Sequence, residues 1–365
     1  MSADLRLIRP DVQAMHAYMV QDAGSMVKLD AMENPYGLPT DLQALLGERL
    51  GRVAINRYPG ARINDLRQAL AATMDLPPGY GLTLGNGSDE LISLLALACA
   101  HNGATVLAPE PGFVMYAMSA RLQGLGFIGV PLQSDFSLDE AAMAAAIAQH
   151  RPAIVYFAYP NNPTANLWDV AVLRRLIAQA SAYGALVVMD EAYQPFAAHS
   201  WLQEIQQDPQ ANRQVLLMRT LSKFGLAGVR LGYMAGPADL VAQIDKVRPP
   251  YNVSVLNAEC ALFALEHAPV FAAQAAQICA QRERLAQALA ALPGLQVFPS
   301  QANMILVRVQ GDAGAADRVF AGLKARQVLV KNVSTMHPLL ANCLRLTVGT
   351  APENTLLLAA LETSL

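Results

Sequence analysis

Residues 185–193 read ALVVMDEAY and residues 215–223 read VLLMRTLSK. Each stretch is a short apolar run that ends in charged side chains, Asp190 and Glu191 in the first and Lys223 in the second. A short continuous apolar run is typical of a strand that is buried on both faces of a sheet. A carboxylate directly after such a strand is costly unless a cation lies close to it, so we expect a positive group nearby.

The same pattern repeats between about residues 82 and 235, in runs such as TVLAP, GFIGVPL, AIVYFAYP and RLGYMAG. Helical segments rich in Ala and Leu lie between several of these runs. Alternating strands and helices predict an α/β fold with a mostly parallel sheet covered by helices. Beyond Pro250 a long helical stretch at about 257–292 precedes shorter strands and helices. This change of pattern predicts a smaller α+β domain, completed by the N-terminal arm.

Composition limits the classes of partner. The 365 residues are 53% hydrophobic and 15% charged, with a net charge of -3, and they contain no block of Lys and Arg that would favour nucleic acid. The first twenty residues scatter charges where a signal peptide is apolar, and the run LISLLALACA is too short to cross a bilayer. The four cysteines form no CxxC pair and the six histidines form no metal-ligand spacing. We therefore expect a cytoplasmic protein with a small-molecule partner, no metal and no contact with membranes or nucleic acid.

An anion site is suggested by GNGSDE, residues 85–90, which lies between the apolar YGLTL and a helical segment. Glycines allow close approach of the backbone, and the free N–H groups of a helix N-terminus suit a phosphate. Taken alone, the stretch also fits an ordinary tight turn with Ser88 or Asp89 as the helix N-cap. A dinucleotide fingerprint would need a third glycine where Glu90 stands, so we do not expect a nicotinamide cofactor.

Together these strand ends meet the chemical needs of one cofactor. Pyridoxal phosphate requires a lysine for a Schiff base, a carboxylate that keeps its ring nitrogen protonated, and a phosphate site. Lys223, Asp190 and residues 85–90 supply these three functions at the ends of predicted parallel strands, where ligands of open α/β sheets bind. Arg230 could add a bidentate contact to the phosphate. Asn162 and Tyr193 could hydrogen-bond the ring oxygen, while Tyr116 fits a packing role.

Four motifs in this order, PNNPT (160–164), DEAY (190–193), RTLSK (219–223) and CLRLTVGT (343–350), resemble the class I/II, fold type I pyridoxal-phosphate aminotransferases. Within that family, LDAMENPYG, NRYPG, GNGSDE and PGFVMY resemble the histidinol-phosphate aminotransferase branch. The resemblance covers nearly the whole chain. It implies a large cofactor domain at 41–254 with a mostly parallel seven-stranded sheet, a small domain formed by 1–40 and 255–365, and a homodimer.

The resemblance also implies a role for each matching residue. Lys223 would bind the cofactor and move the proton, Asp190 would pair with the ring nitrogen, and Asn162 and Tyr193 would bind the ring oxygen. Phe113 would stack on the ring. The phosphate would be held by the backbone N–H groups of Ser88 and Asp89, by Ser222 and Arg230, and by Tyr58 of the other subunit. The substrate would be bound by Arg345, Asn34, Tyr18 and Lys331. The chain departs from the family pattern at Met32, where Asn is frequent, at Ala165, where Gly is frequent, and at Lys331, where Arg is common.

The implied reaction is transamination of histidinol phosphate with 2-oxoglutarate, giving imidazole-acetol phosphate and glutamate in histidine biosynthesis. Two other activities on the same scaffold remain open, transamination of aromatic amino acids and decarboxylation of phosphothreonine. A ligand sensor without turnover is a more remote alternative. Such sensors usually carry a fused DNA-binding domain, for which this chain has no room.

Overall fold

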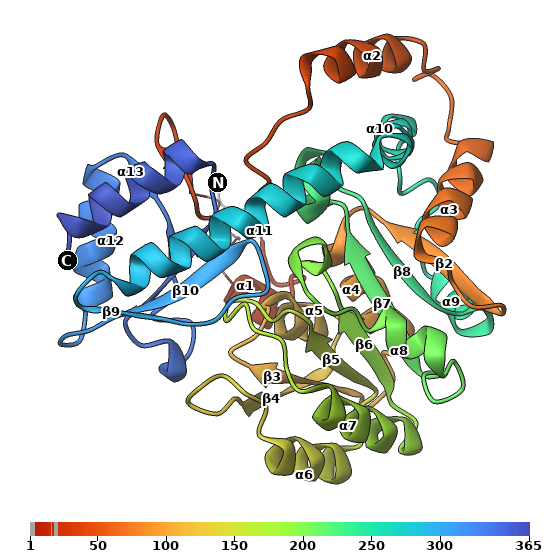
Figure 1. The fold of residues 1–365 in the computed structure, drawn as a ribbon. Coiled ribbons are helices and arrows are strands. Elements are labelled where there is room, and N and C mark those ends of the chain that lie inside the picture. Colours follow the sequence, from red (N-terminus) through yellow and green to blue (C-terminus); the bar gives the residue numbers. More distant parts are fainter. Residues whose placement is uncertain (1–3, 16, 18–20) are drawn as a thin grey trace.

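The computed structural model describes residues 4–15, 17 and 21–365. Its main feature is a seven-stranded sheet, in which the strands follow the order β2-β8-β7-β6-β5-β3-β4 (Figure 1). These strands are β2 (Tyr80–Gly85), β3 (Thr105–Glu110), β4 (Gly126–Pro131), β5 (Ile154–Ala158), β6 (Leu186–Asp190), β7 (Val215–Thr220) and β8 (Gly232–Pro237). Only β8 is antiparallel to its two neighbours, so the expected mostly parallel sheet is confirmed.

Helices cover both faces of this sheet. One face carries α3 (Ala61–Met74), α6 (Glu140–His150), α7 (Val170–Ala182) and α8 (Leu202–Gln207). The other face carries α4 (Ser88–Ala98), α5 (Met115–Leu122) and α9 (Ala238–Asp245). Alternate residues of each strand point to opposite faces, so burial on both sides requires the continuous apolar runs seen in the sequence.

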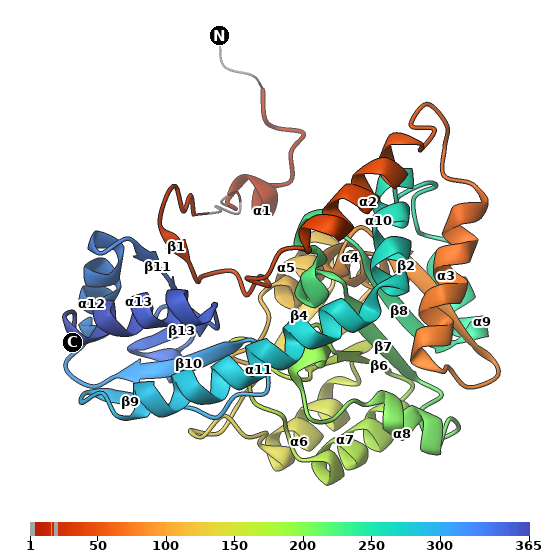
Figure 2. The same cartoon turned by 45° about the horizontal axis from the view of Figure 1, so that its top comes forward.

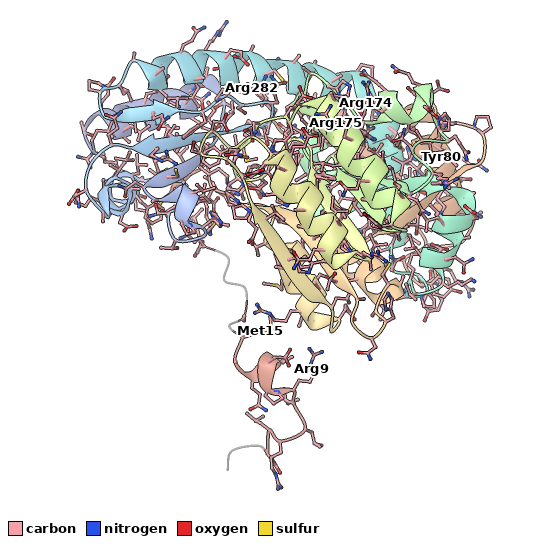
Figure 3. All side chains as sticks on the ribbon, turned by 90° about the horizontal axis from the view of Figure 1, so that it is seen from below. Arg9, Met15, Tyr80, Arg174, Arg175 and Arg282 are labelled. Atoms are coloured by element: carbon pink, nitrogen blue, oxygen red, sulfur yellow. The ribbon has the colours of Figure 1, made fainter. Side chains whose placement is uncertain are left out.

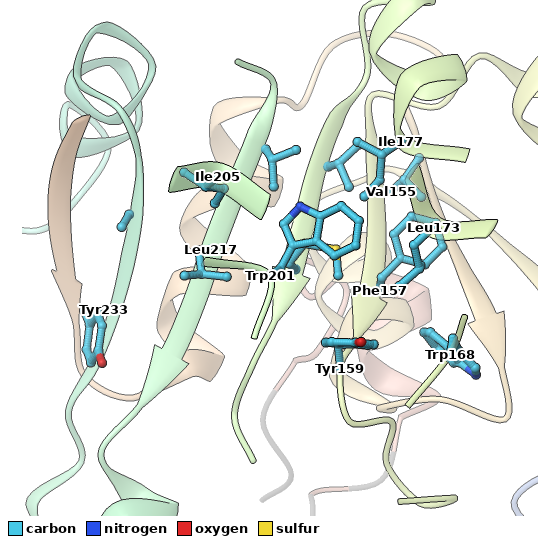
Figure 4. Close-up of a cluster of buried hydrophobic side chains, with 14 of the residues drawn as sticks. Val155, Phe157, Tyr159, Trp168, Leu173, Ile177, Trp201, Ile205, Leu217 and Tyr233 are labelled. Atoms are coloured by element: carbon cyan, nitrogen blue, oxygen red, sulfur yellow. The ribbon is translucent and has the colours of Figure 1, made fainter. Parts of the chain in front are cut away.

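Strand β5 illustrates this packing. Val155 and Phe157 belong to the first apolar cluster, while Ile154 and Tyr156 belong to the second. Figure 4 shows the first cluster, with Phe157 and the Trp201 indole among the side chains that fill the layer between sheet and helices. The rigid core fixes the carboxyl ends of the strands, which carry the predicted functional residues.

The C-terminal part contains a second sheet, in the order β12-β13-β10-β9. Its strands are β9 (Leu295–Val297), β10 (Met304–Val309), β12 (Lys331–Asn332) and β13 (Cys343–Thr347), accompanied by α12 (Ala315–Ala325) and α13 (Ala351–Glu362). The N-terminal β1 (Val27–Lys28) pairs in parallel with β11 (Val328–Leu329), so this part of the N-terminal segment lies beside the C-terminal elements (Figure 2). The domain boundaries at residues 40 and 254 stay predictions.

The helical stretch expected at 257–292 is divided into α10 (Val255–Glu266) and α11 (Ala268–Ala290), which are bent by 77° relative to each other. Pro269, at the start of α11, fits the break, because proline has no N–H to continue the hydrogen-bond ladder of α10. Across residues 4–15, 17 and 21–365, no single helix is long and apolar enough to span a membrane, and α10 and α11 reach that length only when joined across their bend.

Shorter elements complete the chain: α1 (Pro10–Gln13), α2 (Thr40–Gly51), and the turns η1 (Gln194–Phe196), η2 (Ser222–Leu226), η3 (Ala227–Val229) and η4 (Pro338–Leu340). Arg9, just before α1, donates hydrogen bonds to the carbonyl oxygens of Arg121 and Leu122 at the end of α5. Figure 3 shows Arg9 and Met15 on the side of the molecule opposite Arg282 of α11. The N-terminal segment is thus attached to the domain that holds the large sheet.

Candidate active site

Several strands of the large sheet end at one cavity of about 350 Å³. Because the carboxyl ends of parallel strands lie at the same edge, the loops after β2, β3, β5, β6 and β7 converge there. The predicted cofactor residues that line the cavity are Ser88, Asp89, Phe113, Asn162, Asp190, Tyr193, Ser222, Lys223 and Arg230. The volume falls in the range of small-molecule sites.

Lys223 follows β7 in a turn of irregular helix, Ser222–Leu226. Its Nζ donates a hydrogen bond of 2.9 Å to the carbonyl oxygen of Ala31. Part of the side chain faces the cavity, but the surrounding protein removes most of its water. This desolvation, together with the positive charges of Arg345 and Arg230, lowers the pKa of Lys223 to about 8. A larger fraction of the amine is therefore neutral and nucleophilic near neutral pH.

Asp190 ends β6 at the floor of the cavity and is only 4% exposed. Its Oδ2 accepts a hydrogen bond of 2.6 Å from the Tyr116 hydroxyl, and its Oδ1 accepts one of 3.1 Å from the backbone N–H of Ala192. Burial raises the pKa of Asp190 to about 6, while the two hydrogen bonds oppose that rise. A buried carboxylate in this position stabilises a cationic group placed above it.

The neighbouring Glu191 is fully buried and points away from the cavity. Its carboxylate accepts hydrogen bonds from Ser200 Oγ, from the N–H of Trp201, and from Nε and Nη2 of Arg219 at 3.0 and 2.9 Å. Arg219 is thus the cation expected near this carboxylate. The ion pair joins the ends of β6 and β7, the strands that precede Asp190 and Lys223.

An anion cradle lies where α4 begins. Arg230 has a left-handed backbone (φ 54°), and its guanidinium lies 3.3 Å from Ser222 Oγ and 3.4 Å from an oxygen of Asp89. A Cβ atom on Gly87 would lie 2.7 Å from Arg230 Nη2, and a Cβ atom on Gly232 would lie 2.8 Å from the backbone N of Ser88. Glycine at both positions therefore lets the arginine and the helix N-terminus meet, which suits a phosphate group.

A second cationic position comes from the smaller sheet. Arg345 of β13 is 8% exposed, and it donates hydrogen bonds of 2.7 Å to Asn162 Oδ1 and 2.9 Å to the carbonyl oxygen of Asp30. Lys331 of β12 is the direct cross-strand partner of Arg345. Side chains of directly opposed residues lie on the same face of an antiparallel pair, which places two positive charges side by side.

Two aromatic residues line the cavity near these charges. The Tyr193 ring centroid lies 5.8 Å from Lys223 Nζ, and burial raises the pKa of its hydroxyl well above the ordinary value. Phe113 meets Tyr116 edge to face, with ring centroids 5.6 Å apart. These positions allow the roles that the sequence predicts for Tyr193 and Phe113, which stay predictions.

Several predicted residues lie outside the cavity wall. Tyr58 is 76% exposed and stacks on Tyr251 with ring centroids 4.4 Å apart. Asn34 donates to Gln274 Oε1, accepts from the N–H of Tyr36, and packs close to Gly225 in the turn that carries Lys223. Tyr18 lies outside the described residues. The cofactor role of Tyr58 and the substrate roles of Asn34, Tyr18 and Lys331 stay predictions.

Tyr116 is a site residue that the sequence pattern did not reveal. Its place three residues after Phe113 predicts a packing role only. In the structure Tyr116 is 3% exposed and stacks on Tyr156 with ring centroids 4.2 Å apart. Its hydroxyl donates a hydrogen bond to Asp190. The only available signal was a tyrosine on an otherwise apolar helix face, where a buried hydroxyl needs a partner.

We expect Tyr116→Phe to raise the pKa of Asp190 from about 6, because the hydrogen bond that favours the charged form is lost. A hydrogen bond to a charged group is worth about 1.5–3 kcal/mol, which corresponds to a rise of about one to two pH units. Infrared titration of the carboxylate band in the cofactor-free protein measures this pKa, with Asp190→Asn identifying the band. Tyr156→Phe is the matched control, since the Tyr156 hydroxyl has no hydrogen-bond partner among the described residues. An unchanged pKa in Tyr116→Phe contradicts the assignment.

Comparison with known proteins agrees with this geometry. Residues 25–361 match the model of the family described as aminotransferase class I and II. Histidinol-phosphate aminotransferases of Acidovorax sp. (strain JS42) and Paracidovorax citrulli are 67% and 65% identical to the chain, covering 99% and 100% of it and 97% and 99% of their own lengths.

Among solved structures, histidinol-phosphate aminotransferase from Sinorhizobium meliloti in complex with pyridoxal-5'-phosphate aligns with a TM-score of 0.85 at 25% identity, over 100% of this chain and 98% of that one. The fold type I architecture expected from the sequence is therefore confirmed. Both the family match and the full-length similarity show that this chain belongs to the class I and II aminotransferases.

Proposed function

We propose that the protein transfers the amino group of histidinol phosphate to 2-oxoglutarate, forming imidazole-acetol phosphate and glutamate in histidine biosynthesis. The observation that carries the proposal is the cross-strand pair of cations Arg345 and Lys331, in which Arg345 donates a hydrogen bond to Asn162 in the wall of the cavity. Full-length relatives named for this activity, at 65–67% identity, support it.

We infer that the cavity binds pyridoxal phosphate. The glycine-lined cradle of Arg230 and Ser88 fits its phosphate, Asp190 fits its protonated ring nitrogen, and the lowered pKa of Lys223 suits covalent attachment of its aldehyde. When bound, the cofactor supplies an electron sink for the negative charge that develops on the substrate carbon.

The protein's own residues would orient the substrate and move the proton. Lys223 Nζ would hold and move the proton of the amine-bearing carbon of the substrate. The Asp190 carboxylate would stabilise a positive charge placed next to it, because the site excludes water and the Tyr116 hydroxyl fixes Oδ2 of Asp190. Arg345 donates a hydrogen bond to Asn162. The residue proposed to bind the substrate anion is therefore linked directly to the residue proposed to bind the oxygen of the cofactor ring.

The pair of cations fits both substrates in turn. A guanidinium binds either a phosphate or a carboxylate in bidentate fashion, so Arg345 can bind histidinol phosphate in one half-reaction and glutamate in the other. A phosphate group carries more negative charge than a carboxylate at neutral pH, and Lys331 opposite Arg345 supplies the additional positive charge. Aromatic amino acids and phosphothreonine are the competing substrates.

The visible spectrum of the purified holoenzyme tests the proposal. Histidinol phosphate should convert the absorbance of the bound pyridoxal form to that of the amino form, and 2-oxoglutarate should restore it. Tyrosine and phosphothreonine, added in parallel, should react much more slowly. A stronger response to tyrosine, or release of carbon dioxide from phosphothreonine, would replace the proposed substrate while keeping the cofactor.

We further propose a cytoplasmic homodimer in which Tyr58 reaches the cofactor phosphate of the other subunit. Its exposure and its stacking on Tyr251 support a role beyond the chain's own core. Hybrid dimers test this arrangement: subunits carrying Lys223→Ala, mixed with subunits carrying Tyr58→Ala, should form some sites with both native residues and regain activity. Activity no higher than the sum of the separate variants would contradict a shared site.

A further inference from the structure

We infer that Glu33 binds the ring N–H of the substrate's imidazole group and thereby selects a nitrogen heteroaromatic side chain. This inference rests on the proposed function. The charged side chains that line the cavity in the described part of the chain are Glu33, Asp89, Asp190, Lys223 and Arg230. Arg230, Asp190 and Lys223 fit the cofactor's phosphate, ring nitrogen and aldehyde, and the Asp89 carboxylate lies 3.4 Å from the Arg230 guanidinium, whereas Glu33 has none of these roles.

The segment that carries Glu33 runs past both reactive positions of the site. The carbonyl oxygen of Asp30 accepts from Arg345 at 2.9 Å, and the carbonyl oxygen of Ala31 accepts from Lys223 Nζ at 2.9 Å. Glu33 lies two residues further along the same cavity wall. The substrate carries its phosphate, its amine-bearing carbon and its imidazole ring on one short chain. These three groups follow the same order as Asp30, Ala31 and Glu33. Two residues of extended chain span at most about 7 Å, so Glu33 lies within that distance of Ala31.

The backbone before Glu33 is held in an unusual conformation. Met32 has a φ of 52°, which is left-handed and disfavoured for a residue with a long side chain. Its N–H donates to Thr347 Oγ1 at 3.0 Å, and its carbonyl oxygen accepts from Asn303 Nδ2 at 2.9 Å. Both partners are buried. The smaller domain thus fixes the direction in which the chain presents Glu33, as expected where backbone strain serves a site.

The carboxylate has room for a ligand. Lys28 Nζ lies 2.5 Å from Oε2 of Glu33, and among the described residues no hydrogen bond is made to Oε1. The Glu33 side chain is 45% exposed, so the pair with Lys28 contributes little to stability and does not by itself explain the fixed backbone. A neutral imidazole has one N–H donor and an imidazolium has two, so Oε1 can accept from either form.

The test uses the holoenzyme and three ligands. The first is histidinol phosphate, the second is its analogue with a phenyl ring in place of the imidazole, and the third is glutamate. Glu33→Ala should raise the half-saturating concentration of histidinol phosphate by about tenfold or more, the effect of one charge-assisted hydrogen bond. The half-saturating concentrations of the phenyl analogue and of glutamate should change less than twofold. The analogue of histidinol phosphate that lacks the amino group binds without turnover. Calorimetry should show that Glu33→Ala lowers the affinity for this analogue by the same factor.

Two further variants separate recognition from a structural effect. Glu33→Gln should recover part of the affinity, because an amide oxygen still accepts a hydrogen bond but attracts an imidazolium less. Lys28→Met removes the ion pair and keeps the carboxylate, so it should retain affinity for histidinol phosphate within about threefold. The inference is overturned if Glu33→Ala weakens the phenyl analogue equally, or if Lys28→Met reproduces the loss. A wild-type holoenzyme that does not react with histidinol phosphate would instead contradict the proposed function.

Discussion

Replacing Lys223 with alanine is expected to abolish covalent binding of the cofactor and to lower the transamination rate by about four orders of magnitude, the upper end for loss of acid–base catalysis. The reason is geometric. Lys223 provides the amine that lines the cavity, and its pKa of about 8 keeps it available both for attack on an aldehyde and for proton transfer. Nothing else in the cavity wall supplies a primary amine, as far as the described residues extend.

The measurement combines two readouts. Borohydride reduction followed by mass analysis of the intact protein reports covalent attachment, and the half-reaction with histidinol phosphate reports proton transfer. Lys246→Ala removes an exposed lysine of the same protein and should leave both readouts unchanged. A small added amine should restore part of the rate in Lys223→Ala, because it can carry the proton in place of Nζ. Turnover by Lys223→Ala at a rate close to wild type would refute the assignment.

Sequence patterns were sufficient where a local property determines the structure. Strands β3 to β8 were predicted because burial on both faces requires continuous apolar runs, and their polar ends identified Asp190 and Lys223. The antiparallel direction of β8 was not predicted, because it depends on pairing between distant segments. The bend at Pro269 could have been predicted, since a proline inside a helical pattern ends or kinks the helix.

Contacts between distant parts of the chain could not be predicted from the sequence. The hydrogen bond from Tyr116 to Asp190 joins residues 74 positions apart, and the one from Arg345 to Asn162 joins residues 183 apart. Neither leaves a periodic signal. The departure at Met32 is informative only in the structure: its φ of 52° is a conformation that asparagine adopts more readily, which gives a physical reason for the residue frequent in the family.

Arg345→Ala is expected to weaken histidinol phosphate and glutamate together, by about 100-fold or more for each. Two hydrogen bonds from a guanidinium to an anion are worth about 1.5–3 kcal/mol each, and every 1.4 kcal/mol is tenfold in affinity. The loss also removes the donor to Asn162 Oδ1. In addition, the pKa of Lys223 should rise from about 8, since the charge of Arg345 is one of the causes that lower it. Half-saturating concentrations in the two half-reactions measure the first effect, and the pH dependence of aldehyde binding to the cofactor-free protein measures the second.

Two variants sharpen this prediction. Arg345→Lys keeps the positive charge but loses the planar fork, so it should restore the pKa of Lys223 more fully than it restores affinity for the two anions. Arg308→Ala removes a guanidinium from the same sheet, where Arg308 donates to the carbonyl oxygen of Leu339 and packs over Phe298, and should change neither substrate. If Arg345→Ala weakened only one of the two substrates, a single shared anion site would be wrong. The phosphate and the carboxylate would then bind at separate cations, with Lys331 the first candidate for the other, because it is the direct cross-strand neighbour of Arg345.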